Sequence, residues 1–325
     1  MITVTGSLAF DNIMDFQGKF SDHIMPDKIH QINLSFLVKT LKKQKGGTAG
    51  NIAYNLALLQ TPVSIVGAVG SDFSEYSEFL KKAGVDVSQI KIIPDESTSS
   101  AFIMTDLSDN QITAFYPGAM TQNSTLMISP SRSQSPPGRW SKDFVVISPN
   151  DPKAMIKFTK EVQEKNIPYM LDPGMQLPAL DPEDLRSMIN GATILIGNDY
   201  EISLLCDKLQ VTSDKLLENV KILITTLGEK GSTIQTGLPD SPSRSQSSPG
   251  RWQIKAAKPS EVVDPTGAGD AYRAGFLAGY MKDLSLQVCG QMGSVASCYA
   301  IEKYGTTSHS FSVEEFENRL KENYG

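Results

Sequence analysis

VVDPTGAGDAYRAGFLAGY, residues 262–280, is the stretch that decides the fold. Its pattern predicts a strand that ends in the two valines, a glycine-rich turn, and then a helix with an apolar face. Gly267 and Gly269 have no Cβ, so the backbone there can turn tightly and approach a ligand. The amides of Ala268, Gly269 and Asp270 would then point out of the helix N-terminus, which is a site for phosphate or another anion.

Asp270 places a carboxylate in the first turn of this otherwise apolar helix. A first-turn acid complements the helix dipole, which is a purely structural role. The same carboxylate, beside an anion site, also suits a general base. The residues alone leave both interpretations open.

Two motifs resemble the signatures of one family. DPTGAGD at residues 264–270 resembles the C-terminal signature of the ribokinase-like (phosphofructokinase-B type) carbohydrate and nucleoside kinases, and GGTAGN at residues 46–51 resembles their N-terminal signature. The resemblance covers almost all of the chain. The sequence of the N-terminal half is most similar to prokaryotic adenosine kinases and broad-specificity nucleoside kinases. It implies ATP-dependent phosphorylation of a hydroxymethyl group by a doubly wound α/β domain with a small β-sheet lid.

Short apolar runs alternate with helical stretches through the second half of the chain. This alternation predicts βαβ units and a mostly parallel sheet with helices on both faces. The predicted strands are 144–148, 169–172, 194–197 and 222–226, and the helices between them are 152–165, 183–189 and 200–208.

Two further stretches indicate the β-sheet lid. Every second residue from Ile32 to Val38 is apolar, as in a strand with one covered face. Residues 101–105 and 112–116 flank LSDNQ, which is a hairpin signal. With the resemblance, this assigns 11–40 and 98–118 to the lid, and 1–10, 41–97 and 119–325 to the α/β domain that binds nucleotide and substrate.

Polar or glycine residues follow directly after several predicted strands. Ligands of open α/β sheets bind beyond the carboxyl ends of the strands. The one-sided distribution therefore predicts an active site at this edge of the sheet. The residues concerned are Asp11, Asn150, Asp172, Asn198, Gly228 and Asp270.

The resemblance implies a substrate site made from both halves of the chain, with Asp270 as its catalytic base. Asp11 would hold two sugar hydroxyls, because a carboxylate accepts both O–H bonds at once. From the residues alone, an Asx turn that closes the strand is the favoured interpretation of Asp11, and the glycine pair 46–47 is compatible with a hinge before a helix. The full substrate-binding set is Asp11, Gly46, Gly47, Asn51, Asn150 and Asp270.

The resemblance also implies an ATP site with Mg²⁺. NDYE at residues 198–201 has the spacing of a helix capping box, and this role is compatible with contacts to phosphate. The implied ATP-binding residues are Asn198, Thr226, Gly228, Gly267 and Gly269, and the implied anion hole is Gly267, Ala268 and Gly269. Asp172 and Glu201 are assigned to Mg²⁺ through water, and Asp264 and Thr266 to a possible K⁺ ion.

Charge and composition narrow the class of partner. The net charge is −6 and no block of Lys and Arg follows a helix face, which argues against nucleic acid. No apolar run approaches the ~20 residues of a membrane span. The three cysteines have no zinc spacing, and the N-terminus lacks a signal-peptide plan, so we expect a cytoplasmic protein. Exposed strand edges on the lid would favour a homodimer.

One sequence occurs twice. SPSRSQSPPGRW at residues 129–140 and SPSRSQSSPGRW at residues 241–252 match at eleven of twelve positions. The composition is typical of a flexible, basic loop. We interpret both copies as insertions peripheral to catalysis, although a phosphorylatable docking site is the alternative.

The predicted function is transfer of the γ-phosphate of ATP to the 5′-hydroxyl of a nucleoside, with adenosine as the first choice. A sugar kinase acting on ribose, fructose or a phosphosugar is the alternative within the family. The alternative from another class is a non-catalytic sensor that binds a nucleotide or nucleoside. The sequence contains no Walker-type G-x-x-x-x-G-K-[ST] loop, so a P-loop enzyme is excluded.

Overall fold

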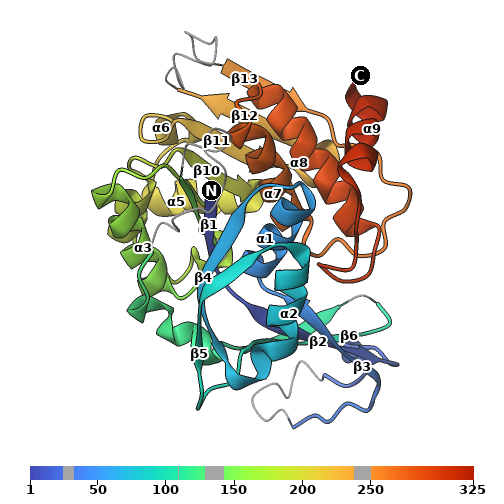
Figure 1. Ribbon diagram of the computed structural model, residues 1–325. Coiled ribbons are helices and arrows are strands. Elements are labelled where there is room, and N and C mark those ends of the chain that lie inside the picture. Colours follow the sequence, from blue (N-terminus) through green and yellow to red (C-terminus); the bar gives the residue numbers. More distant parts are fainter. Residues whose placement is uncertain (25–32, 109, 129–142, 238–249) are drawn as a thin grey trace.

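The computed structural model describes residues 1–325 except 25–32, 109, 129–142 and 238–249. It contains a large sheet flanked by helices and a small separate sheet that projects below it in Figure 1. None of the helices in the described residues is long and apolar enough to cross a membrane.

The large sheet has nine strands in the order β13-β12-β11-β10-β9-β8-β1-β4-β5. All neighbours from β5 to β11 are parallel, and β12 is antiparallel to both β11 and β13. The mostly parallel sheet is therefore confirmed. The strands are β1 (Ile2–Thr5), β4 (Val63–Gly70), β5 (Asp86–Ile93), β8 (Phe144–Ile147), β9 (Tyr169–Leu171), β10 (Ile194–Asn198), β11 (Ile222–Thr226), β12 (Ser232–Thr236) and β13 (Gly250–Ile254).

Helices cover both faces of this sheet, because each central strand is apolar on both sides. In β8, Phe144 and Val146 join one buried cluster while Val145 and Ile147 join the other. The first cluster packs under α1 (Thr48–Leu58), α2 (Ser74–Ala83), α7 (Ala268–Met281), α8 (Leu286–Ile301) and α9 (Val313–Tyr324). The second packs under α3 (Pro152–Glu164), α4 (Pro182–Ile189), α5 (Asp199–Leu209) and α6 (Ser213–Leu216).

The small sheet has the order β3-β2-β6-β7. Its strands are β2 (Ala9–Phe16), β3 (Val38–Gly46), β6 (Ser99–Thr105) and β7 (Gln111–Tyr116). The hairpin of β6 and β7 is confirmed, and the side chain of Asp106 closes its turn by accepting bonds from the amides of Ser108 and Asn110.

Three boundaries in this sheet differ from the sequence prediction. The strand expected from Ile32 begins only at Val38, and residues 33–37 have no regular structure, while Ile32 lies outside the described residues. The boundary placed at residue 41 falls inside β3, and the one at residue 10 falls inside β2. Antiparallel pairing from Ala9–Gly46 to Phe16–Val38 extends both strands beyond what their apolar pattern indicates.

The strand predicted to end in Val262 and Val263 is absent from this described segment. Both side chains are exposed, and the amides of Val263 and Asp264 donate to the carbonyl of Ile301 at the end of α8. The segment is held by a helix C-terminus, where free carbonyls need donors, and not by a sheet.

The second copy of the repeat is also not wholly a loop. Residues 129–140 and 241–249 lie outside the described residues, but Gly250, Arg251 and Trp252 form the start of β13. Trp252 pairs with Ile234 of β12 and packs against the core. The expectation of a flexible loop is therefore wrong for these three residues, because they form the start of an edge strand of the large sheet. The interpretation of both copies as insertions peripheral to catalysis stays a prediction.

Candidate active site

The first turn of α7 presents free amides to a cleft. Its N-cap residue, Gly267, has φ 81° and provides no side-chain cap. The amide of Ala268 donates to Pro265 at 3.3 Å, whereas no acceptor in the described residues pairs with the amides of Gly269 and Asp270. The predicted anion site therefore rests on these two amides, and Ala268 is engaged within the turn.

Asp270 lies beside Asn51, from the other end of the chain. Asn51 Nδ2 donates to Asp270 Oδ2 over 2.8 Å, although the two residues are 219 positions apart. Gly47, with φ 89°, lies between the end of β3 and the start of α1 as the N-cap of that helix, so that Asn51 falls in its first turn. The GGTAGN and DPTGAGD motifs thus form a single site.

The environment of Asp270 raises its pKa to about 6. Burial is the main cause, since a desolvated carboxylate is less stable. The charge of Arg273 and the hydrogen bond from Asn51 act in the opposite direction, while Asp172 and Asp11 add to the increase. A carboxylate that titrates near neutral pH is suited to accept a proton from a hydroxyl.

Asp11 is held against bare backbone in the small sheet. A Cβ added to Gly46 would lie 2.2 Å from Asp11 Oδ2, so the carboxylate occupies the space that a side chain would fill. Asp11 belongs to β2, and the alternative of an Asx turn is therefore wrong. Burial, reinforced by the charge of Asp264, raises the pKa of Asp11 to about 6.

A cleft of about 380 Å³ lies at the carboxyl ends of β9, β10 and β11. It brings together most of the residues predicted for nucleotide and metal. Asn150 does not line it, because this side chain is fully buried and its Oδ1 accepts from Asn123. The predicted residues that line it are Asp172, Asn198, Glu201, Thr226 and Gly228 from the strand ends, and Gly267, Gly269 and Asp270 from the turn and first residues of α7.

Asn198 and Glu201 form the predicted capping box at the start of α5. Burial raises the pKa of Glu201, and the charge of Asp172 raises it further. Two carboxylates that repel one another across a cleft suit Mg²⁺, which prefers oxygen ligands and keeps several waters. In the described part of the chain, no three His, Cys, Asp or Glu side chains are close enough to hold a metal ion as a cluster.

Asp264 ties the glycine-rich turn to the loop after α8. Its two carboxylate oxygens accept from the amides of Thr266 and Gly305, at 2.9 and 3.0 Å. Asp264, one of the two residues assigned to a possible K⁺ ion, therefore has a structural function, which is to hold the turn in shape.

Arg273 is the charged residue of the cleft that the sequence reasoning missed. It lies one turn after Asp270 on α7, and its Nε is 2.5 Å from Asp172 Oδ2. The available signal was its isolation, since it is the only charged residue between Asp270 and Lys282.

Comparisons with known proteins agree with this geometry. Residues 8–312 match the pfkB family of carbohydrate kinases. A nucleoside kinase of Methanocaldococcus jannaschii is 31% identical over 322 residues, covering 98% of this chain and 96% of the relative. A nucleoside kinase of Methanothermobacter thermautotrophicus is 31% identical over 328 residues, covering 100% and 96%.

Solved structures of nucleoside kinases are also similar to this chain. A Burkholderia thailandensis nucleoside kinase in complex with inosine is similar with a TM-score of 0.84 and 34% identity, covering 100% of this chain and 98% of the other. The fold is ribokinase-like, and the fold and site define a phosphotransferase with an alcohol group as acceptor. The chain belongs to the pfkB family of carbohydrate kinases.

Proposed function

We propose that this enzyme is an ATP-dependent nucleoside kinase that phosphorylates the 5′-hydroxyl, with adenosine as the first acceptor to test. The observation that carries the proposal is the 2.8 Å bond from Asn51 to Asp270, which joins the acceptor-binding motif to the base. Two relatives that cover nearly the whole chain are nucleoside kinases, and the Burkholderia structure contains inosine, which supports a purine nucleoside.

The ribose would be held between the small sheet and α1. Asp11 accepts hydrogen bonds from two neighbouring hydroxyls, and Gly46 leaves room for the sugar and the carboxylate together. Asn51 Oδ1 is buried and has no partner among the described residues, so it is available to a hydroxyl donor.

Asp270 accepts the proton of the attacking hydroxyl, and the amides of Gly269 and Asp270 stabilise the negative charge of the transferred group. Phosphoryl transfer depends mainly on positioning and charge, so a base with a pKa of about 6 is strong enough.

The nucleotide would lie across the strand ends, against Asn198, Thr226 and Gly228. Another structure of the Burkholderia enzyme is described as a complex with ADP-inosine, which supports a nucleotide in the cleft. Mg²⁺, held through water by Asp172 and Glu201, would neutralise charge on the phosphate oxygens. The carbonyls and carboxylate around Asp264 and Thr266 are the place where K⁺ would bind.

The test is ADP release by the purified enzyme with ATP and Mg²⁺. Adenosine, inosine, cytidine, ribose, fructose and a phosphosugar are each offered as acceptors. We expect a nucleoside to give the highest kcat/KM; turnover confined to a sugar would overturn the proposal in favour of a sugar kinase. Binding without turnover of any acceptor would favour the sensor.

A comparison of Asp270→Asn with Glu314→Gln distinguishes loss of the proposed base from the general effect of removing an acidic side chain. Glu314 is an exposed acid in the first turn of α9, as Asp270 is an acid in the first turn of α7, but Glu314 lies away from the cleft. Only the Asp270 variant should lose turnover.

The lid is also the surface we propose for a homodimer. Phe102, Ile112 and Phe115 are each more than 40% exposed on β6 and β7. Light scattering on the purified enzyme would test this, and a monomeric mass at assay concentrations would reject it.

A further inference from the structure

Arg273 joins two elements of the cleft. Its Nε is 2.5 Å from Asp172 Oδ2, directly after β9, and its Nη1 donates to the carbonyl of Gly269 over 2.8 Å. The side chain is 7% exposed. A guanidinium is rigid and offers several donors in one plane, so a single side chain can hold both partners at a fixed separation. Arg273 therefore connects the strand end to the first turn of α7.

Among the described residues that line the cleft, Arg273 is also the single cation. Three carboxylates line the same space: Asp172, Glu201 and Asp270. A buried charge is costly unless an opposite charge compensates it. The other charged or titratable groups that face Asp270 are Asp172 after β9, Asp11 on β2 and Tyr76 on α2.

We propose that Arg273 is a positioning residue of the phosphoryl transfer, which fixes the Asp172 carboxylate and the first turn of α7 and balances the charge of Asp270. The proposal rests on the phosphotransferase activity and not on which nucleoside is the acceptor. In support, the charge of Arg273 is the largest influence that lowers the pKa of Asp270, against the increase due to burial.

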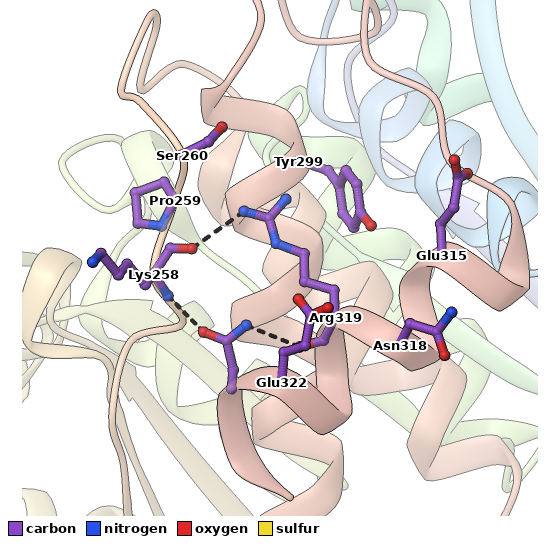
Figure 2. A pocket seen from close by; sticks show the side chains of 9 residues that line it. Lys258, Pro259, Ser260, Tyr299, Glu315, Asn318, Arg319 and Glu322 are labelled. Carbon is purple, nitrogen blue, oxygen red and sulfur yellow. Dashed lines mark hydrogen bonds between the residues drawn. The ribbon is translucent and has the colours of Figure 1, made fainter.

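A second ion pair provides a matched control outside the active site. Arg319 on α9 contacts Glu302 at 2.5 and 2.9 Å and donates to the carbonyl of Lys258. Figure 2 shows Arg319 in a surface groove beside Tyr299, whose ring centroid is 4.6 Å from the guanidinium. No residue of the cleft lines this groove. Arg319→Gln therefore breaks a similar pair without changing the charge next to Asp270.

The experiment compares Arg273→Gln, Arg273→Lys and Arg319→Gln with the unchanged enzyme. It measures the thermal midpoint, kcat and KM for acceptor and ATP, and the pH profile of kcat/KM. A fourth measurement follows the titration of Asp270 by carboxyl NMR in the free protein. Because this last measurement needs no substrate, it remains informative if the proposed acceptor is wrong.

We expect Arg273→Gln to lower kcat by about 10- to 100-fold with little change in acceptor KM. In this variant, the acid limb of the pH profile of kcat/KM and the NMR titration of Asp270 should both move to higher pH by about one unit or more, because a nearby positive charge is lost. Arg273→Lys keeps the charge but not the double contact, so it should lower kcat while the titration stays within about half a unit. Arg319→Gln should lower only the thermal midpoint.

Two results would overturn the proposal. One is an Arg273→Gln enzyme whose kcat and Asp270 titration match those of Arg319→Gln. The other is an Asp172→Asn/Arg273→Gln double variant that regains activity together with stability, since this would reduce the pair to a structural contact. If Arg273→Gln does not fold, Arg273→Lys provides the test. An unchanged kcat in Arg273→Lys would reject the positioning role.

Discussion

Substitution of Gly46 by alanine tests whether Asp11 holds the acceptor. The new Cβ would lie 2.2 Å from Asp11 Oδ2, 2.7 Å from Cγ and 3.0 Å from Oδ1. The first two distances are shorter than a Cβ contact can be, so the carboxylate must swing away from its place. Gly46 is not among the glycines with positive φ, so alanine itself imposes no backbone strain. The effect should therefore be local to the carboxylate.

The expected increase in the KM of the nucleoside follows from the hydrogen bonds that Asp11 would make to the acceptor's hydroxyls. Hydrogen bonds to a charged group contribute about 1.5–3 kcal/mol, and every 1.4 kcal/mol corresponds to a factor of ten. Gly46→Ala should therefore raise the KM of the nucleoside by about 10- to 100-fold. The KM of ATP should hardly change, because Asp11 and Gly46 are not among the described residues that line the cleft with Asn198, Thr226 and Gly228.

The assay is ADP release over a range of nucleoside and ATP concentrations. Gly67→Ala is the matched control: this glycine is in β4, and its added Cβ would make an ordinary 3.4 Å contact with Leu8. Asp11→Asn, which keeps the shape but removes the charge, should raise the same KM. A Gly46→Ala enzyme with an unchanged nucleoside KM would show that Asp11 does not hold the acceptor.

Three other results are expected. Asp270→Asn should lower kcat by about 10²–10⁴-fold while the affinity for ATP, measured by calorimetry, is retained; near-normal turnover would exclude Asp270 as the base. In the unchanged enzyme, kcat/KM should fall as the pH decreases through about 6, because both Asp11 and Asp270 must lose their protons to act; an acid limb near pH 4 would contradict this. Removing residues 129–140 and 241–249 should leave turnover within about twofold, whereas extending the second deletion through Trp252 should lower the thermal midpoint, since β13 loses its start.

The positions of most elements followed from local pattern. The periodicity around residues 152–165 and 200–208 predicted α3 and α5 to within one or two residues, because an amphipathic helix repeats its apolar positions over several turns. The same reasoning failed at Val262 and Val263. Two β-branched residues favour a strand, but whether a strand forms depends on a partner, and here the partner is the end of α8.

The sequence by itself determined the class of fold, the two glycine motifs and the position of Asp270 at the end of the second of them, because the motifs are written in contiguous residues. Only the tertiary structure decided how they meet. It places Asn51 against Asp270 across 219 positions, pairs Arg273 with Asp172, and sets the pKa of Asp270 through burial. The physical reason is that charge, burial and hydrogen bonding depend on neighbours in space, which strand order and helix packing supply and which no local pattern contains.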